Sequence, residues 1–297
     1  MPAFQFVPGA LTADEIGAQI FAGDILVFRQ VPALKALVRD IDAMVREGLG
    51  DAEPETAEAR LAPDLFLTRV RKLRSQVRAD KALMQLMGEA VAQVGLPPDD
   101  TYFDGLQLRL VPSSASHQGR RIMPLPPHRD SWGSNIAQQI NWWAPLYPLA
   151  RTRSIVVYPD YWSRPVENNT ADWDYHELKK RMAEGRAETY PVLPTATVPL
   201  EPEEGWAVVI EPGDLLCFSA AHLHGSIADA SGITRFSLET RTVSASHVQA
   251  GIGAPNLDGR APRTTPEWFE RIVDGQSLAE IYGSLSSAPK PYPLGKL

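Results

Sequence analysis

Two histidine-containing segments, far apart in the chain, carry residue types that bind metal ions. His128 and Asp130 lie two residues apart in the first segment, and His222 and His224 lie two residues apart in the second. On an extended strand, residues at this spacing point to the same face, so one strand would present an imidazole and a carboxylate together. One imidazole from the second segment would complete a set of two histidines and one carboxylate.

Such a set, placed on one face of a metal ion, leaves other coordination positions open and is typical of non-heme Fe(II) oxygenases. The alternative interpretation of the first segment is a surface histidine with a hydrogen-bonding aspartate. Spacing does not choose between His222 and His224, because both would share a strand face. A Gly-Ser dipeptide directly after His224 lets the backbone pass close to a bound group. This favours His224 as the ligand and His222 as a nearby pocket residue.

Composition restricts the possible functions. The chain has 297 residues, 44% hydrophobic and 22% charged, as in ordinary soluble globular proteins. Its net charge of −7 lacks the basic footprint of a nucleic-acid-binding protein. The basic residues between Arg69 and Arg78 are the local exception, and their helical spacing predicts a solvent-exposed helix face. Cys217 is the only cysteine, so a disulfide framework and a thiolate zinc cluster are both excluded.

No apolar run approaches the length needed to cross a bilayer, and the N-terminus has no basic region followed by an apolar core. We therefore expect a cytoplasmic protein without membrane partners. The oligomeric state does not follow from the sequence.

Hydrophobic spacing divides the chain into a helical part and a strand-rich part. Residues 1–100 are expected to be mainly helical, with a capped helix at about residue 12, a second from Pro32, a loop over 51–60 and a further helix over 65–94. Residues 101–248 contain short apolar runs separated by turn residues, which is typical of a sandwich or barrel. The expected strands are 23–28, 106–111, 136–146, 154–158, 207–210, 215–218 and 234–243.

A helical insertion is expected at about 173–186. Residues 249–297 read as a Pro- and Gly-rich C-terminal tail with a short helix over 266–273. We expect residues 1–297 to form a single catalytic domain.

Several motifs in residues 101–245 together resemble the phytanoyl-CoA dioxygenase-like family of Fe(II)- and 2-oxoglutarate-dependent oxygenases. Their order and spacing carry the resemblance: Pro127-His128-Arg129-Asp130, then Gly213-Asp214-Leu215-Leu216-Cys217-Phe218, then His224-Gly225-Ser226, then Arg235. The chain departs from the family where Asp160-Tyr161-Trp162 replaces the usual Gly-Ser-His. The resemblance implies a mainly β fold with flanking helices. Its core would be a double-stranded β-helix (jelly-roll, cupin-like) with an N-terminal helical layer.

The resemblance also implies roles for individual residues. His128, Asp130 and His224 would bind Fe(II). Arg235 would pair with the distal carboxylate of 2-oxoglutarate, with help from Ser226, because a planar guanidinium grips a carboxylate through two hydrogen bonds. Arg241, on the same expected strand, is the rival for that role.

The implied activity is that of a non-heme Fe(II)/2-oxoglutarate-dependent dioxygenase. It would use O₂ to hydroxylate a small-molecule substrate and release succinate and CO₂. Desaturation, cyclisation and epimerisation would use the same residues.

Strand alternation identifies candidate pocket residues. Gln107 and Arg109 alternate with leucines, so both face the interior if the leucines pack on the helical layer; the reverse orientation would place both in solvent. We assign Gln107 to the cofactor site and Arg109 to the substrate pocket. The other pocket candidates share a strand face or adjoin the histidine segments: Trp132, Gln139, Asn141, Trp143 and His222. For Trp132 the alternative is packing in the core.

Two other classes remain as alternatives: a non-catalytic jelly-roll binding protein, and a metal-dependent cupin that does not use 2-oxoglutarate. A downstream arginine argues against the first. The early His-x-Asp argues against the second, because cupins typically carry His-x-His with a later Glu and His. No basic patch suited to the phosphates of an acyl-CoA is evident, so the substrate is not identified.

Overall fold

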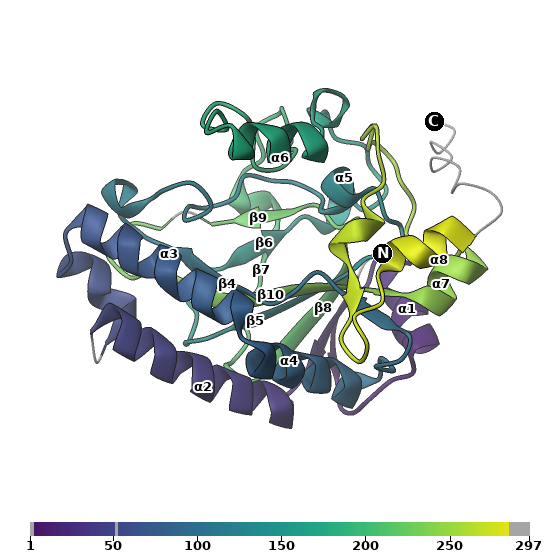
Figure 1. The fold of residues 1–297 in the computed structure, drawn as a ribbon, viewed down its shortest axis with the longest axis horizontal. Coiled ribbons are helices and arrows are strands. Elements are labelled where there is room, and N and C mark those ends of the chain that lie inside the picture. Colours follow the sequence, from purple (N-terminus) through teal and green to yellow (C-terminus); the bar gives the residue numbers. More distant parts are fainter. Residues whose placement is uncertain (1–2, 51–52, 228, 285–297) are drawn as a thin grey trace.

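The computed structural model describes residues 3–50, 53–227 and 229–284. Its N-terminal part is mainly helical, as predicted, and the three helices Pro32–Leu49, Pro63–Ala79 and Lys81–Val94 lie together at one side of the molecule (Figure 1). This part contains β1 (Phe4–Val7), α1 (Ala13–Ile20), β2 (Ile25–Phe28), α2 (Pro32–Leu49), α3 (Pro63–Ala79) and α4 (Lys81–Val94). Among the helices of the described residues, none combines the length with the hydrophobicity that a membrane-crossing segment requires.

The single helix predicted over 65–94 is two helices. Asp80 has an extended backbone (ψ 110°) that ends α3, and its side chain accepts hydrogen bonds from the amides of Ala82 and Leu83 at the start of α4. Aspartate is a strong helix N-cap because its oxygens satisfy amides that lack an intrahelical partner. The predicted loop over 51–60 contains a short 3₁₀ helix at Pro54–Ala59.

The second part of the chain is rich in short strands, as predicted. The elements are β3 (Thr101–Phe103), β4 (Gln107–Val111), α5 (Ser131–Ser134), β5 (Ile140–Pro145), β6 (Ile155–Val157), α6 (Tyr175–Ala183), β7 (Trp206–Ala207), β8 (Leu215–Ser219), β9 (His224–Ser226), β10 (Arg235–Ser244), α7 (Ala245–Ala250), β11 (Glu270–Arg271) and α8 (Leu278–Ser284). The short helix predicted over 266–273 is wrong beyond its first turn, because β11 pairs with β3 at the sheet edge. The last part of the predicted tail, 285–297, lies outside the described residues.

The strands form two sheets. The large sheet has the order β1-β2-β8-β5-β10-β3-β11, with β4 also paired to β10, and the small sheet has the order β7-β6-β9. Every pair is antiparallel except β1 with β2. The large sheet is therefore mixed and has flanking helices, and the described strands form no closed barrel.

Side-chain alternation gives the large sheet two different faces. Apolar residues of β2, β4, β5, β8 and β10 on one face share a core with α2, α3 and α4. At the β2 and β8 end, the opposite face packs on the small sheet through residues such as Val27, Phe218 and Val157. At the β10 and β4 end, this opposite face carries polar and charged residues that line a cavity.

Candidate functional site

The two histidine segments lie side by side. The His128 amide donates to the His224 carbonyl at 2.8 Å, and the His224 amide donates to the His128 carbonyl at 2.9 Å. Gly225 permits this approach, since a Cβ at that position would lie 3.3 Å from the nitrogen of Pro127. The backbone that passes close to Gly225 is therefore that of the segment containing His128.

Asp130 does not lie on an extended strand, so the argument from shared strand face is wrong for this residue. Its backbone is helical (φ −65°, ψ −29°), and its carbonyl accepts from the amide of Gly133 at 3.0 Å in the first turn of α5. A helical turn directly follows the β-bridge at His128. This turn, and not an extended strand, places the Asp130 carboxylate next to the two histidines.

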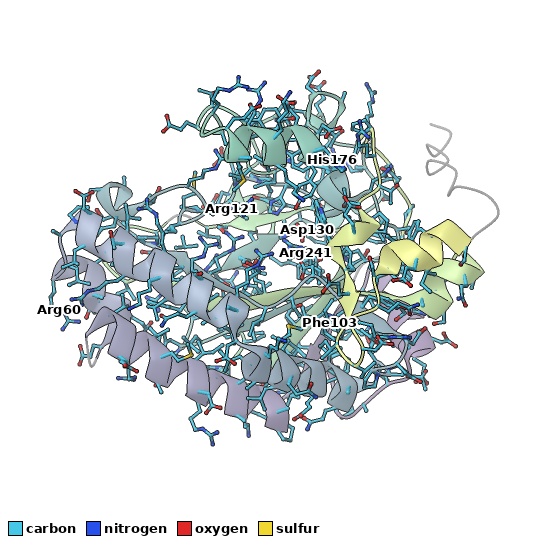
Figure 2. The ribbon with its side chains drawn as sticks, viewed as in Figure 1. Arg60, Phe103, Arg121, Asp130, His176 and Arg241 are labelled. Carbon is cyan, nitrogen blue, oxygen red and sulfur yellow. The ribbon has the colours of Figure 1, made fainter. Side chains whose placement is uncertain are left out.

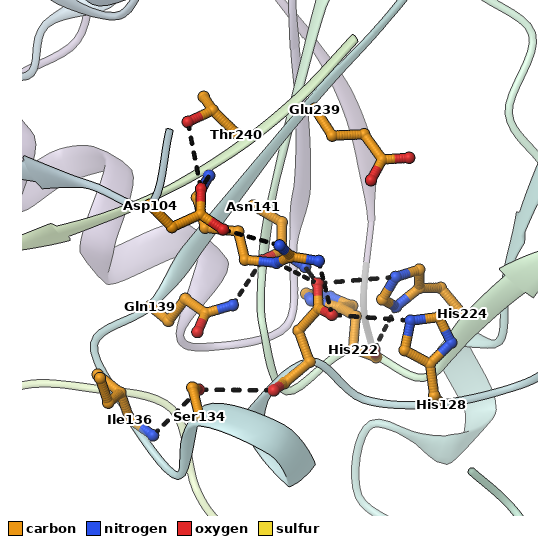
Figure 3. A network of polar contacts seen from close by, with 12 residues as sticks. Asp104, His128, Ser134, Ile136, Gln139, Asn141, His222, His224, Glu239 and Thr240 are labelled. Carbon is orange, nitrogen blue, oxygen red and sulfur yellow. Dashed lines mark hydrogen bonds and ion pairs between the residues drawn. The ribbon is translucent and has the colours of Figure 1, made fainter. Parts of the chain in front are cut away.

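The rings of His128 and His224 lie side by side (Figure 3), and the Asp130 carboxylate lies close to both, so the three side chains converge on one point. Nε2 of His128 lies 3.7 Å from Oδ1 of Asp130, and Nε2 of His224 lies 4.0 Å from Oδ2. One ligand atom from each residue lies within 4.8 Å of the others, so the group can hold a metal ion. The separation is wider than hydrogen bonding, as expected where a cation would lie between the donors.

Both histidines present Nε2 to this point because Nδ1 is engaged elsewhere. Nδ1 of His128 donates to the Pro126 carbonyl at 2.8 Å, and Nδ1 of His224 donates to the His222 carbonyl at 3.0 Å. These bonds fix the tautomer that carries a lone pair on Nε2, the form that binds metals. Burial, and then the proximity of His224, lowers the pKa of His128 to about 3. His128 is therefore neutral at physiological pH.

The Asp130 carboxylate is held by two further residues. Arg241 donates from Nε to Oδ2 and from Nη2 to Oδ1, each at 3.2 Å, and Asn141 donates to Oδ2 at 2.6 Å. Arg241 also donates from Nη1 to Asp104 at 2.8 Å (Figure 3). Burial alone would raise the pKa of Asp130, but the Arg241 charge and then His224 outweigh it, so the pKa lies below its usual value. The carboxylate stays ionised.

Arg235 is buried, with 2% of its surface exposed, next to this cluster. Its Nη2 donates to Oγ of Ser226 at 3.1 Å, while Nε and Nη1 have no hydrogen-bond partner among the described residues. Burial, and then the charge of Arg109, lowers the pKa of Arg235 to about 9. A small cavity lined by Arg235, Ser226, His224 and Asp130 lies beside these unpartnered nitrogens. This arrangement suits an anionic ligand, whereas the guanidinium of Arg241 is already paired.

A second cavity of about 890 Å³ is lined by two residues of this cluster, His128 and Asp130. The leucines of β4 pack into the helical core and Gln107 and Arg109 line this cavity, so the predicted orientation of the strand is confirmed. Arg109 donates to Glu239 at 2.5 Å. Gln107 is not among the residues that line the small cavity beside Arg235, which argues against its predicted place at the cofactor.

The pocket residues predicted from residues 139–143 separate into two groups. Asn141 and Trp143 line the small cavity. Gln139 is fully buried and lines neither cavity, but its Nε2 donates to Oδ1 of Asn141 at 3.0 Å. Gln139 therefore orients Asn141, which in turn holds Asp130.

Trp132 and His222 are not pocket residues. Trp132 is fully buried in an apolar cluster with Val156 and Leu223, and its indole N–H donates to Asp258 at 2.7 Å. His222 is 1% exposed, and its ring nitrogens lie 2.8 Å and 3.1 Å from the carbonyls of Gly23 and Ser219. Both side chains belong to the core, and His222 contributes to the site only through the carbonyl that accepts from His224.

Two acidic residues of the site were missed by sequence reasoning. Glu239 lies on β10 between Arg235 and Arg241 and points to the same face, so alternation could have identified it. Asp104 lies in the loop between β3 and β4, where no periodicity indicates its role.

The prediction that the basic residues of 69–78 form a solvated face is only partly right. Arg71 and Lys72 are exposed, but Arg74 is half-buried and donates from Nε to the Leu108 carbonyl at 3.0 Å. Arg74 and Arg78 line the large cavity together with Arg121. A basic patch therefore lines the cavity, with Arg74 and Arg121 half-buried and Arg78 exposed.

Comparison with protein-family models and with curated proteins gave no match, so the resemblance to the phytanoyl-CoA dioxygenase-like family is not confirmed. Among solved structures, the chain is similar to EvdO2 from Micromonospora carbonacea var. aurantiaca complexed with 2-oxoglutarate (13% identity, 80% of this chain and 93% of that chain, TM-score 0.43). It is also similar to the epimerase SnoN in complex with Fe3+, alpha ketoglutarate and nogalamycin RO (16% identity, 84% and 95%, TM-score 0.41).

The match to EvdMO1 covers 53% of this chain and 30% of that chain, at 18% identity and a TM-score of 0.32. Similarity at this level does not assign an activity, so the function must be argued from the residues of the site.

Proposed function

We propose that this protein is a non-heme Fe(II)- and 2-oxoglutarate-dependent oxygenase that acts on a small molecule. One observation carries the proposal: a His-Asp-His cluster with free Nε2 atoms adjoins a buried arginine with two unpartnered nitrogens. The donor set fits Fe(II), and the unpartnered guanidinium fits a carboxylate of the cosubstrate. The described β elements would then be a double-stranded β-helix core within a single catalytic domain.

His128, Asp130 and His224 would hold the metal. The carbonyls of Pro126 and His222 orient the two imidazoles, and Arg241 and Asn141 orient the carboxylate. When bound, Fe(II) supplies O₂ activation coupled to the decarboxylation of 2-oxoglutarate to succinate and CO₂. Oriented ligands of this kind raise metal affinity because the side chains need little reorganisation on binding.

Arg235 and Ser226 would bind the distal carboxylate of 2-oxoglutarate. The Nη2 bond to Ser226 orients the guanidinium, and Nε and Nη1, on its two other sides, keep N–H groups that could donate to a carboxylate. Trp143 and Phe218 line the same small cavity and exclude water around this ion pair. A charge-assisted pair is stronger in such a low-dielectric environment than at a surface.

The large cavity would bind the primary substrate, since its lining includes His128 and Asp130. Gln107 and Arg109 face it from β4 and would contact the substrate. We propose hydroxylation as the reaction.

The direct test is succinate formation from 2-oxoglutarate with Fe(II) and O₂, in the parent protein and in Asp130→Asn. Turnover in the parent that is lost in the variant is the expected result. Iron binding without succinate would instead support a metal-dependent cupin that does not use 2-oxoglutarate, and the absence of both would support a binding protein.

A further inference from the structure

The large cavity has an unequal charge distribution. Nine of its described lining residues are Arg or Lys and five are Asp or Glu, although the whole chain carries a net charge of −7. Several of these cations already have carboxylate partners: Arg109 with Glu239, Arg129 with Asp258, Arg241 with Asp104 and Asp130, and Arg271 with Asp274. The excess positive charge is carried by the other cations.

Four unpaired cations lie on neighbouring elements of one wall. Arg74 and Arg78 are one helical turn apart on α3, Lys81 begins α4, and Arg121 lies in the turn between Gly119 and Ile122. Within the described part of the chain, no carboxylate oxygen lies within 4.0 Å of any of them. Like charges gathered in this way repel one another unless an anion lies between them.

Arg74 is held by a hydrogen bond and Arg121 is half-buried, whereas Arg78 and Lys81 are exposed. The Nε bond from Arg74 to the Leu108 carbonyl leaves its two terminal nitrogens for another acceptor. Burial, and then the charge of Arg109, lowers the pKa of Arg74 to about 10. In Figure 2, Arg121 lies between α3 and α6, toward Asp130 and Arg241.

The backbone at Arg121 is strained. Its φ of +63° is in the left-handed region, which disfavours side chains other than glycine. Two backbone hydrogen bonds between Gly119 and Ile122, at 2.7 and 3.0 Å, hold the turn in this conformation. Strain of this kind persists where the surrounding structure fixes it, and it is frequent at ligand sites.

Aromatic side chains provide another part of the cavity lining. Trp173, Tyr175, Trp268 and Phe103 line it, and the rings of Tyr175 and Trp268 meet edge to face with centroids 4.5 Å apart. The cavity therefore offers planar apolar surfaces in addition to a wall of unpaired guanidinium groups.

We propose that Arg74, Arg78 and Arg121 bind an anionic group of the primary substrate, a carboxylate or a phosphate, while the aromatic residues contact its apolar body. Guanidinium groups suit either anion because their donors match two oxygens at once. The identification of this ligand as a substrate rests on the proposed function. Anion binding itself requires neither iron nor 2-oxoglutarate, so it can be tested separately.

The test titrates the full chain, without metal, with phenyl phosphate, benzoate and the neutral benzyl alcohol by calorimetry. Both anions should bind more tightly than the alcohol, and the tighter anion identifies the group. Arg74→Gln/Arg78→Gln should weaken anion binding about ten-fold or more and leave the alcohol unchanged. Arg71→Gln/Lys72→Gln removes the same charge from the exposed part of α3 and should leave all affinities similar.

Arg74 also donates a hydrogen bond to β4, so its substitution could disturb the fold. A second variant controls for this effect. Arg121→Gln, in a turn, should weaken anion binding in the same direction, with thermal unfolding checked for each protein. Equal anion affinity in parent and cavity variants, an equal loss in the Arg71→Gln/Lys72→Gln control, or no anion binding to the parent overturns the proposal. Loss of anion binding in Arg235→Gln, with no loss in the Arg74, Arg78 and Arg121 variants, also overturns the proposal, because it would place the anion at Arg235. If the protein lacks oxygenase activity, these affinities are unaffected.

Discussion

The two faces of β10 have different surroundings: one packs into the apolar core, and the other lines the two cavities. Phe236 and Leu238 are fully buried against the helical core. Arg235, Glu239 and Arg241, at the alternate positions, face the cavities. The hydrophobic effect stabilises the fold and does not depend on the orientation of the apolar groups. Buried charges, in contrast, need an oppositely charged partner or a bound ligand.

The cavity face itself has two different ends. Arg241 is paired with Asp104 and Asp130, so its guanidinium positions a carboxylate. Arg235 keeps two nitrogens without a protein partner among the described residues. Spacing does not distinguish the two arginines, but their partners do: Arg241 is paired with carboxylates, and Arg235 is the one for which we propose anion binding.

The largest effect is expected for Asp130→Asn at the centre of the cavity face. The variant keeps the shape but removes the charge that Fe(II) and Arg241 share, so iron affinity and succinate formation should each fall about 100-fold or more. Metal titration and a 2-oxoglutarate turnover assay measure both. Near-parental values would mean that the cluster is not a metal site, and the contrast between the two faces would lose its functional meaning.

A comparison of His224→Ala with His222→Ala separates a ligand from a core histidine. His224→Ala should abolish iron binding. His222→Ala should leave iron affinity within about three-fold. Its main effect should be on stability, with a loss of about 1–3 kcal/mol, because a buried, hydrogen-bonded ring that packs on Trp162 is removed. Iron titration and urea unfolding test the pair, and similar iron affinities for the two variants would contradict it.

Much of the fold and part of the site could be predicted from sequence because both depend on local spacing. The alternation of β4 predicted that its leucines pack on the helices and that Gln107 and Arg109 face the cavity. The proximity of His128 to His224 was predicted because both are residue types that bind metal ions. Asp130 shows the limit: its position depends on a helical turn that begins at α5, which strand spacing does not contain.

What could not be predicted depends on long-range pairing. Asp104 joins the site through a contact with Arg241, 137 residues away, and Arg74 turns inward through its bond to Leu108. The choice between pocket and core for Trp132 could not be made either, because its indole partner, Asp258, lies in the region predicted to be tail. No local pattern encodes such contacts, since they arise only when the elements pack.

A smaller effect is expected at the two ends of the cavity face. Arg235→Ala should raise the KM for 2-oxoglutarate about ten- to a hundredfold, because a charge-assisted hydrogen-bonded pair is lost. Its iron affinity should stay similar. Arg241→Ala should lower iron affinity about ten-fold, because Asp130 loses its orienting partner, and should leave the KM for 2-oxoglutarate similar. Steady-state kinetics and iron titration on both variants give the comparison. A raised KM in Arg241→Ala alone would show that the wrong arginine was chosen.

The smallest effect on cofactor binding is expected from the opposite face of the same strand. Leu238 is fully buried and lies opposite Leu108 and Ala144 on the neighbouring strands. Leu238→Ala should lower the free energy of unfolding by about 2.5–5 kcal/mol through lost burial and a cavity. Iron affinity and the KM for 2-oxoglutarate should change less than about two-fold, because mutations without shared partners act nearly independently. Urea unfolding beside the two binding measurements decides the matter. If Leu238→Ala weakened cofactor binding as strongly as Arg235→Ala, the two faces of β10 would not be separable, and the polar face would owe its geometry to the packing beneath it.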